Sequence, residues 1–231
     1  MALAILCSGG DAPGMNAALK KFVDHVYKCG QTPWFIYDGL EGMIDGTIRQ
    51  AYHKDVAGIL HNGGTIIGSS RSKRFYDPVY RRQAFENLQK YGIDGVVVLG
   101  GDGSYNAFEV LSREHPVNFV GIPGTIDNDI YGTEYCLGVD TALNVIRHAV
   151  DNIRDTASSF KRAFVVETMG RECGYLAAVT AITSGAEICA IPEICFNKDA
   201  AQEQLKKEIS GGRRYVLAIV AEGTKMTEEI R

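Results

Sequence analysis

The segment GVVVLGGDGS (95–104) joins an unbroken run of β-branched and apolar residues to a pair of glycines and a polar turn. Such a continuous apolar run is typical of a strand that is buried on both faces of a parallel sheet. On either side of it, further apolar runs of strand length alternate with longer stretches whose apolar residues recur at helical spacing. The predicted strands are 2–6, 33–39, 95–101, 118–123, 163–168, 187–193 and 214–223, and the predicted helices are 15–30, 54–61, 78–91, 104–113, 140–157, 173–185 and 199–209.

This alternation of strands and helices predicts a doubly wound α/β fold, in which helices sandwich a mainly parallel sheet. No repeat, low-complexity tract or linker interrupts the alternation. The pattern therefore gives no reason to divide residues 1–231 into independent domains.

The composition is that of an ordinary globular protein, with 45% hydrophobic and 23% charged residues. The net charge of −4 argues against a general attraction to nucleic acid or to an anionic membrane surface. No apolar run approaches the ~20 residues that span a bilayer, and the N-terminus lacks the basic region of a signal peptide. The six cysteines contain no C-x-x-C pair, so we expect reduced thiols and a cytoplasmic location.

Four glycine-containing turns follow predicted strands: SGGDAPG (8–14), GGDGS (100–104), PGTIDND (123–129) and MGREC (169–173). Ligands of open parallel sheets bind at the carboxyl ends of the strands, where these turns are expected. Backbone N–H groups without a neighbouring Cβ, followed by a helix N-terminus, suit phosphate groups. The sequence contains neither a G-x-x-x-x-G-K-[ST] P-loop nor a complete G-x-G-x-x-G fingerprint. Walker-type ATP hydrolysis and Rossmann-type NAD binding are therefore disfavoured.

The motifs SGGDAPGMNAA, GGDGS, PGTIDND and MGREC, in this order and together with GGTIIGSSR and IPE, resemble the 6-phosphofructokinase family. The resemblance covers essentially all 231 residues. It implies a glycolytic phosphotransferase that transfers the γ-phosphoryl group of ATP to the 1-hydroxyl group of fructose 6-phosphate, giving fructose 1,6-bisphosphate. It also implies Mg²⁺ as a cofactor and a cytoplasmic homotetramer, with no nucleic-acid or membrane partner.

Two positions relate the chain to the ATP-dependent branch of this family. Relatives that use pyrophosphate carry an aspartate and a lysine where this chain has Gly103 and Gly124. Residues 1–231 thus resemble a phosphofructokinase domain, with the nucleotide-binding part and part of the sugar-phosphate-binding part. Family chains continue with a G-H-x-Q-R-G-G-like segment that does not occur in this sequence. The C-terminal remainder of the family domain is therefore expected to be absent.

On the donor side, the resemblance implies that Asp102 holds Mg²⁺, which prefers one or two carboxylates together with phosphate oxygens and waters. Arg71 is expected to bridge the donor and acceptor phosphates, because a guanidinium fork matches phosphate oxygens. The Ser104 hydroxyl group is expected either to cap the following helix or to contact phosphate. The complete donor set is Gly9, Gly10, Arg71, Gly101, Asp102, Gly103 and Ser104.

On the acceptor side, Asp127 is expected to be the general base, since a sugar hydroxyl group needs a proton acceptor within hydrogen-bond reach. The resemblance adds Gly10, Thr125 and Arg171 to the catalytic set. Arg162 matches a family arginine that reaches the sugar phosphate of a neighbouring subunit. The complete acceptor set is Thr125, Asp127, Asp129, Arg162, Met169, Gly170, Arg171 and Glu222, of which Glu222 resembles an acceptor from a sugar hydroxyl.

Two other functions fit part of this pattern. The GGDG turn alone is unspecific, because NAD kinases and diacylglycerol-type lipid kinases carry a similar turn. A small-molecule kinase of either kind is therefore an alternative enzyme. A catalytically silent nucleotide-binding or regulatory subunit is the alternative outside the enzymes, and it predicts ATP affinity without turnover.

Overall fold

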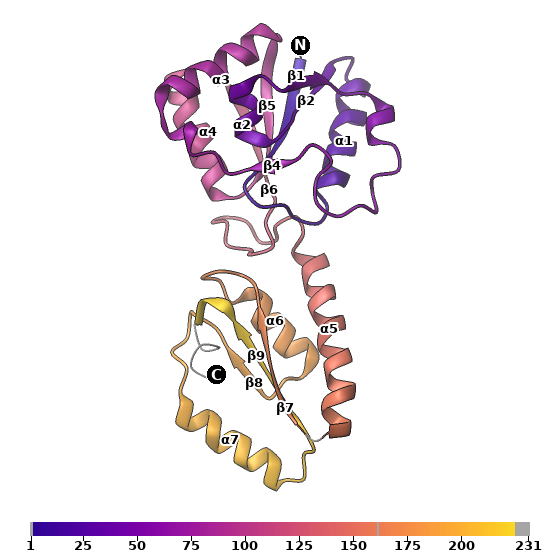
Figure 1. The fold of residues 1–231 in the computed structure, drawn as a ribbon, viewed down its shortest axis with the longest axis vertical. Helices are drawn as coiled ribbons and strands as arrows, with labels where there is room; N and C mark the ends of the chain where they lie inside the picture. The colour runs from indigo at the N-terminus through magenta and orange to yellow at the C-terminus, as the bar shows by residue number, and fades with distance from the viewer. Residues whose placement is uncertain (1, 161, 225–231) are drawn as a thin grey trace. The chain divides into compact units, whose positions relative to one another are not determined.

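The computed structural model describes residues 2–160 and 162–224, which form two compact units (Figure 1). The first unit contains the described residues up to Thr125 and the short segment Cys136–Gly138. The second contains Ile126–Tyr135 and the described residues from Val139 onward. The predicted α/β class with mainly parallel strands is confirmed, but the strands are divided between two sheets.

The sheet of the first unit is built from β1 (Ala2–Ser8), β2 (Thr32–Ile36), β3 (Ile48–Gln50), β4 (Ser69–Ser70), β5 (Ile93–Gly100) and β6 (Asn118–Pro123). Its order is β3-β2-β1-β5-β6, and β4 pairs with the end of β1. The pairings are parallel except for the antiparallel pair β2–β3. The central strands β1 and β5 are buried for most of their length, as their apolar runs predict.

Four segments of this sheet end at the same level. Ser8 pairs with Ser70 of β4 and with Gly100 of β5, and Gly100 pairs in turn with Pro123 of β6. The residues that follow these four therefore lie beside one another at the carboxyl edge of the sheet.

The helices of the first unit are α1 (Met15–Lys28), α2 (Gly39–Asp45), α3 (Pro78–Lys90) and α4 (Asp102–Glu114), with 3₁₀ helices η1 (His53–Val56) and η2 (Arg74–Tyr76). Figure 1 shows α1 on one side of the sheet and the other three α-helices on the opposite side. The core on that opposite side includes the fully buried Leu6, Val98 and Phe108. Helices therefore cover both faces of the sheet, as its buried central strands require.

Two short elements differ from the sequence prediction. The apolar run 33–39 divides into β2 and the start of α2, whose sequence GLEGMID contains two glycines and gives little helical signal. Gly42 is required there, because a Cβ would lie 1.7 Å from the carbonyl oxygen of Tyr37. The predicted helix 54–61 is reduced to the 3₁₀ helix η1, since Ala57 is extended and Gly58, inside the predicted helix, has a φ of +71°.

The second unit has a parallel three-stranded sheet made of β7 (Ala163–Thr168), β8 (Ile188–Ala190) and β9 (Val216–Ala221), in the order β7-β9-β8. Its helices are α5 (Val139–Phe160), α6 (Tyr175–Ser184), α7 (Lys198–Ser210) and the 3₁₀ helix η3 (Glu222–Thr224). The core packs Val150 of α5 and Ala177 of α6 against Ile219 of β9. No helix among the described residues is long and apolar enough to cross a membrane.

Candidate active site

The first glycine turn begins directly after β1. Gly9 has a φ of +90°, a conformation that favours glycine, and its N–H donates to the carbonyl oxygen of Ser70 (3.1 Å). The carbonyl oxygen of Gly9 accepts a hydrogen bond from the Ser69 hydroxyl group (2.9 Å). Gly10 is exposed, and a Cβ there would meet no atom within 4 Å. The turn is therefore fixed at Gly9 and open at Gly10, where a phosphate group can approach the backbone.

The second turn joins β5 to α4 and packs closely against β1. A Cβ at Gly100 would lie 2.6 Å from the carbonyl oxygen of Ser8, so only glycine fits. Gly101 is the N-cap residue of α4, and Gly103 is exposed with open space where a Cβ would be. The buried Ser104 hydroxyl group donates to the Ser8 carbonyl oxygen (3.3 Å). This hydroxyl group therefore links the turn to β1 and does not cap α4.

Asp102 is the first residue of α4, and its side chain is exposed. One carboxylate oxygen, Oδ2, accepts a hydrogen bond from the Asn106 side-chain amide (2.9 Å). The described part of the chain contains no group of three or more His, Cys, Asp or Glu side chains that could hold a metal ion. Nucleotide-bound Mg²⁺ needs only one or two carboxylates. A single exposed carboxylate beside an open glycine turn therefore fits such an ion.

Arg71 and Thr125 lie at the same carboxyl edge of the sheet as the two glycine turns, because the strands before them end at the same level. Arg71 directly follows β4, and its side chain is exposed. Thr125 comes two residues after β6, and the N–H of Gly124 before it donates to the Gly100 carbonyl oxygen (3.0 Å). The structure thus brings the predicted donor residues and Thr125 together in the first unit.

The PGTIDND turn passes from the first unit to the second, with Thr125 in the first and Asp127 in the second. Asp127 is only 9% exposed, whereas Asp129 lies in solvent. Between them, Asn128 adopts a φ of +57°, and its side-chain amide donates to the Glu134 carbonyl oxygen (3.2 Å). Asp127 therefore lies on a turn of fixed shape and is largely shielded from water.

The MGREC turn follows β7 and is held by a carboxylate. Thr168 at the end of β7 pairs with Ala221 at the end of β9, which places Glu222 beside the turn. The Oε1 atom of Glu222 accepts hydrogen bonds from the backbone N–H of Gly170 (3.0 Å) and of Arg171 (2.5 Å). Glu222 was predicted as a sugar-binding residue, and the structure adds that it fixes this turn.

The backbone of the same turn is tightly constrained. Gly170 has a φ of +135°, and a Cβ there would lie 2.5 Å from the Cys173 carbonyl oxygen. Arg171 adopts a φ of +54°, and its side chain is exposed, as is that of Met169. The structure therefore brings Met169, Gly170, Arg171 and Glu222 together at the carboxyl end of the second sheet.

Arg162 does not join this group. It directly precedes β7, so it lies at the amino end of the strand that ends before Met169. Its guanidinium group lies 5.3 Å from the centre of the Phe160 ring, and it lines a pocket of about 380 Å³ with Arg213 and Tyr215. Within one chain, Arg162 is thus separated from the other predicted sugar-phosphate residues of the second unit.

The sequence prediction overlooks Asn16, which is only 1% exposed. Its side-chain amide donates to the carbonyl oxygens of Asn62 (3.0 Å) and Gly63 (3.2 Å), and its Oδ1 accepts from the Ile66 N–H (2.8 Å). Asn16 therefore fixes the loop that leads to β4 and Arg71. The available signal is a polar residue on the apolar side of a helix, because buried polar groups need hydrogen-bond partners.

Comparison with known proteins identifies the family. A profile of the phosphofructokinase family matches residues 2–231. The ATP-dependent 6-phosphofructokinase of Wolinella succinogenes is 56% identical over 231 residues, covering 100% of this chain and 72% of that protein. That of a Sulfurovum species is 58% identical over 229 residues, covering 99% of this chain and 70% of that protein.

A solved structure of phosphofructokinase from Saccharomyces cerevisiae has a TM-score of 0.92 and 39% sequence identity. The match covers 96% of this chain and 34% of the yeast chain. The chain therefore spans about 70% of the length of the two bacterial relatives and about a third of the yeast chain. The predicted kinase class is confirmed, and the chain belongs to the phosphofructokinase family.

Proposed function

We propose that this chain phosphorylates the 1-hydroxyl group of fructose 6-phosphate with ATP, giving fructose 1,6-bisphosphate for glycolysis. The observation that carries the proposal is the common level at which β1, β4, β5 and β6 end. Because these strands end together, exposed glycine backbone, one carboxylate and one arginine lie at a single sheet edge. These are groups that bind the phosphates and the Mg²⁺ ion of a nucleotide complex. The activity named for the two bacterial relatives supports the same reaction.

In this proposal the first unit is the nucleotide-binding part. The donor phosphates lie against the backbone of Gly9, Gly10, Gly101 and Gly103, where Gly103 leaves room for a nucleotide. Asp102 would hold Mg²⁺, which neutralises charge on the phosphates during transfer. The Arg71 guanidinium group supplies a second positive charge.

The second unit supplies most of the acceptor site and the base. Asp127 accepts the proton of the 1-hydroxyl group. The sugar oxygen then bonds to the γ-phosphorus while the bond from that phosphorus to ADP breaks. Arg171 stabilises the charge on the transferring group. The sugar phosphate is further contacted by Thr125, Asp129, Met169, Gly170 and Glu222.

We also propose that the protein acts in the cytoplasm as a homotetramer. The position of Arg162, away from the other sugar-phosphate residues of its unit, supports a role in the site of a neighbouring subunit. Size measurement by light scattering tests this part of the proposal, and a purely monomeric active protein contradicts it.

The reaction is tested by measuring ADP release with fructose 6-phosphate, NAD and a diacylglycerol as separate acceptors. Release with fructose 6-phosphate alone supports the proposal, and preference for either other acceptor contradicts it. Replacing ATP by pyrophosphate tests the donor assignment. Binding of ATP without transfer to any acceptor favours the silent nucleotide-binding subunit instead.

A further inference from the structure

Arg71, the arginine proposed to bridge the two phosphates, is held by its neighbours along the chain. Before it, the Ser70 carbonyl oxygen accepts from the Gly9 N–H (3.1 Å), and the Ser70 hydroxyl group donates to the Asp38 carbonyl oxygen (2.6 Å). The Arg71 side chain itself is exposed. The point from which this side chain reaches outward is therefore set by the backbone on either side of it.

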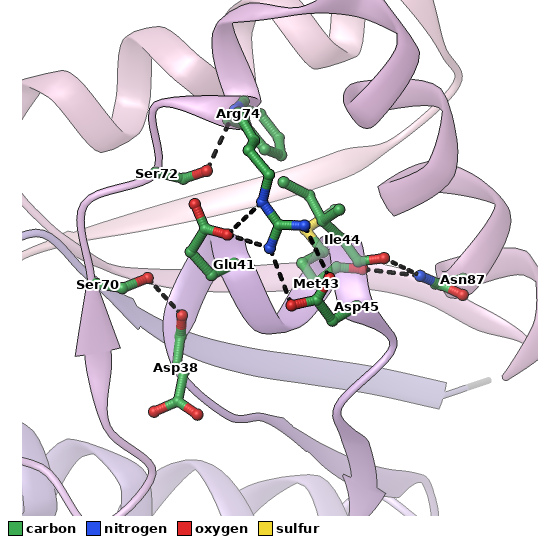
Figure 2. A network of polar contacts seen from close by, with 10 residues as sticks. Asp38, Glu41, Met43, Ile44, Asp45, Ser70, Ser72, Arg74 and Asn87 are labelled. Atoms are coloured by element: carbon green, nitrogen blue, oxygen red, sulfur yellow. Dashed lines mark hydrogen bonds and ion pairs between the residues drawn. The ribbon is translucent and has the colours of Figure 1, made fainter.

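After Arg71, the backbone is attached to α2 by Arg74 (Figure 2). The Arg74 Nη1 and Nη2 atoms each lie 2.9 Å from a carboxylate oxygen of Asp45. Its Nε donates to Oε2 of Glu41 (2.6 Å), which also accepts from Nη2. One guanidinium group thus joins two carboxylates that lie one helical turn apart on α2, and we call these three side chains the Arg74 clasp.

The helix that receives this clasp is itself fixed at both ends. At its start, a Cβ on Gly39 would lie 2.5 Å from the Cys7 carbonyl oxygen, so α2 begins in close contact with the end of β1. At its end, the Asn87 side-chain amide donates to the carbonyl oxygens of Met43 (3.0 Å) and Ile44 (2.7 Å) (Figure 2). A bidentate attachment to such a helix restricts the backbone that carries it.

Charge distinguishes the two arginines of this segment. The two carboxylates of the clasp outweigh the single charge of Arg74. A hydrogen bond from the Ser72 hydroxyl group, together with those from Arg74, lowers the pKa of Glu41, and hydrogen bonds from Arg74 lower that of Asp45. Arg74 therefore presents no net positive charge to a phosphate, whereas Arg71 does.

We propose that Arg74 is a positioning residue, which through Glu41 and Asp45 fixes the backbone from which the Arg71 guanidinium group reaches the phosphates. This inference rests on the proposed function of the site. Only Ser72 and Lys73 lie between the two arginines, so a shift of the clasp moves the bridging guanidinium group. A displacement of ~1 Å in a reacting site can lower the rate by about 10²-fold.

The test compares Arg74→Gln, Arg74→Lys and the control Arg113→Gln, alone and combined with Arg71→Ala. Arg113 suits as a control because it also pairs with a carboxylate, Glu109, but on the exposed surface of α4. Each protein is assayed for kcat and both KM values, for its affinity for a non-hydrolysable ATP analogue, and for its melting temperature.

We expect Arg74→Gln to lower kcat about tenfold, with less than a twofold change in the KM for fructose 6-phosphate. Arg74→Lys keeps the charge without the fork, so it should retain an intermediate kcat. In the Arg71→Ala background, Arg74→Gln should cause no further loss, because the group that it positions is gone. Arg113→Gln should match the wild type in every measurement.

Unchanged kcat in Arg74→Gln, or losses that multiply with Arg71→Ala, overturns the positioning role. If Arg74→Gln does not fold, the same cycle with Arg74→Lys decides. Failure of the proposed function is recognised separately, as absence of transfer by the wild-type protein. In that case the affinities of the single and double variants for the ATP analogue still decide whether Arg74 acts through Arg71, since this measurement needs no turnover.

Discussion

The two units hold their candidate ligand turns by different means. In the first, the turns are fixed by uncharged groups: by glycines packed against backbone, such as Gly100 against the Ser8 carbonyl oxygen, and by the hydroxyl groups of Ser69 and Ser104. In the second, carboxylates accept from the turn itself, with Glu222 bonding two N–H groups and Glu193 bonding the Gly174 N–H (2.7 Å). Backbone N–H groups that remain open attract anions, whereas those already paired with a carboxylate do not.

This difference matches the two proposed ligands. The first unit offers open backbone to the phosphates of a nucleotide. In the proposed function, the second unit contributes fixed polar side chains for the hydroxyl groups of a sugar, and its charge contacts come from arginines such as Arg171. Binding of the donor and activation of the acceptor should therefore respond separately to substitution.

The largest expected effect separates chemistry in the second unit from binding in the first. Asp127→Asn removes the proton acceptor while keeping the size of the side chain, so kcat should fall about 10²–10⁴-fold. The affinity for a non-hydrolysable ATP analogue, measured by calorimetry, should stay unchanged. Asp129→Asn is the comparison variant: Asp129 is proposed to contact the sugar phosphate and not to act as the base, so its loss should raise the KM for fructose 6-phosphate and change kcat far less. Full turnover by Asp127→Asn contradicts the assignment of the base.

The next effect tests whether the turns of the first unit depend on close backbone packing. Gly100→Ala would place a Cβ 2.6 Å from the Ser8 carbonyl oxygen and 2.7 Å from the Ser104 hydroxyl oxygen. Overpacking of this kind costs about 1–3 kcal/mol, so both the melting temperature and the affinity for the ATP analogue should drop. Gly103→Ala meets open space and should melt like the wild type. Equal melting temperatures for the two variants would refute the packing argument.

Sequence patterns predict those helices and strands that are determined by residues adjacent along the chain. Strands β6 and β7 begin and end where their apolar runs do, at 118–123 and 163–168. Helix α2 is not predicted from the sequence, because its glycines lower helix propensity. Close contacts with other segments require these glycines. The division into two sheets follows from long-range pairing of β7 with β9, which no local pattern encodes.

The candidate site shows the same limit. The rule for parallel sheets places the glycine turns at one edge, and the register confirms this arrangement for the turns after β1, β5 and β6. Sequence patterns could not reveal that the Ser104 hydroxyl group bonds to β1, or that Glu222 bonds to the MGREC turn, because both partners are distant along the chain. The roles predicted for single residues in binding and catalysis stay predictions until they are measured.

A smaller effect tests the carboxylate in the second unit. Glu222→Ala frees the N–H groups of Gly170 and Arg171, whereas Glu222→Gln keeps an oxygen that can accept from them. Since hydrogen bonds to charged groups contribute about 1.5–3 kcal/mol, Glu222→Ala should raise the KM for fructose 6-phosphate about tenfold, and Glu222→Gln should raise it less. The freed N–H groups should also make the alanine variant more sensitive to inhibition by inorganic phosphate. Equal phosphate inhibition in the two variants would contradict the contrast between the units.

The smallest effect concerns the ion pair that joins α3 and α4 in the first unit. The buried Arg81 guanidinium group donates to both carboxylate oxygens of Glu114 (2.6 and 2.5 Å) and to the carbonyl oxygen of Phe75 (2.9 Å). The hydrogen bonds from Arg81 to the Glu114 carboxylate lower the pKa of Glu114 below its ordinary value of 4.5. A carboxylate whose pKa is lowered by folding stabilises the protein above its ordinary pKa, and this stabilisation is lost as the pH falls through the folded-state pKa.

Glu114→Gln should therefore lower the free energy of unfolding by about 1 kcal/mol at neutral pH, and by progressively less as the pH falls below 4.5. Denaturant unfolding at a series of pH values measures this difference. Glu109→Gln is the matched control, because the Glu109–Arg113 pair on α4 is exposed to solvent and should contribute little at any pH. A difference that stays constant between pH 7 and acid would show that Glu114 acts through packing and not through its charge.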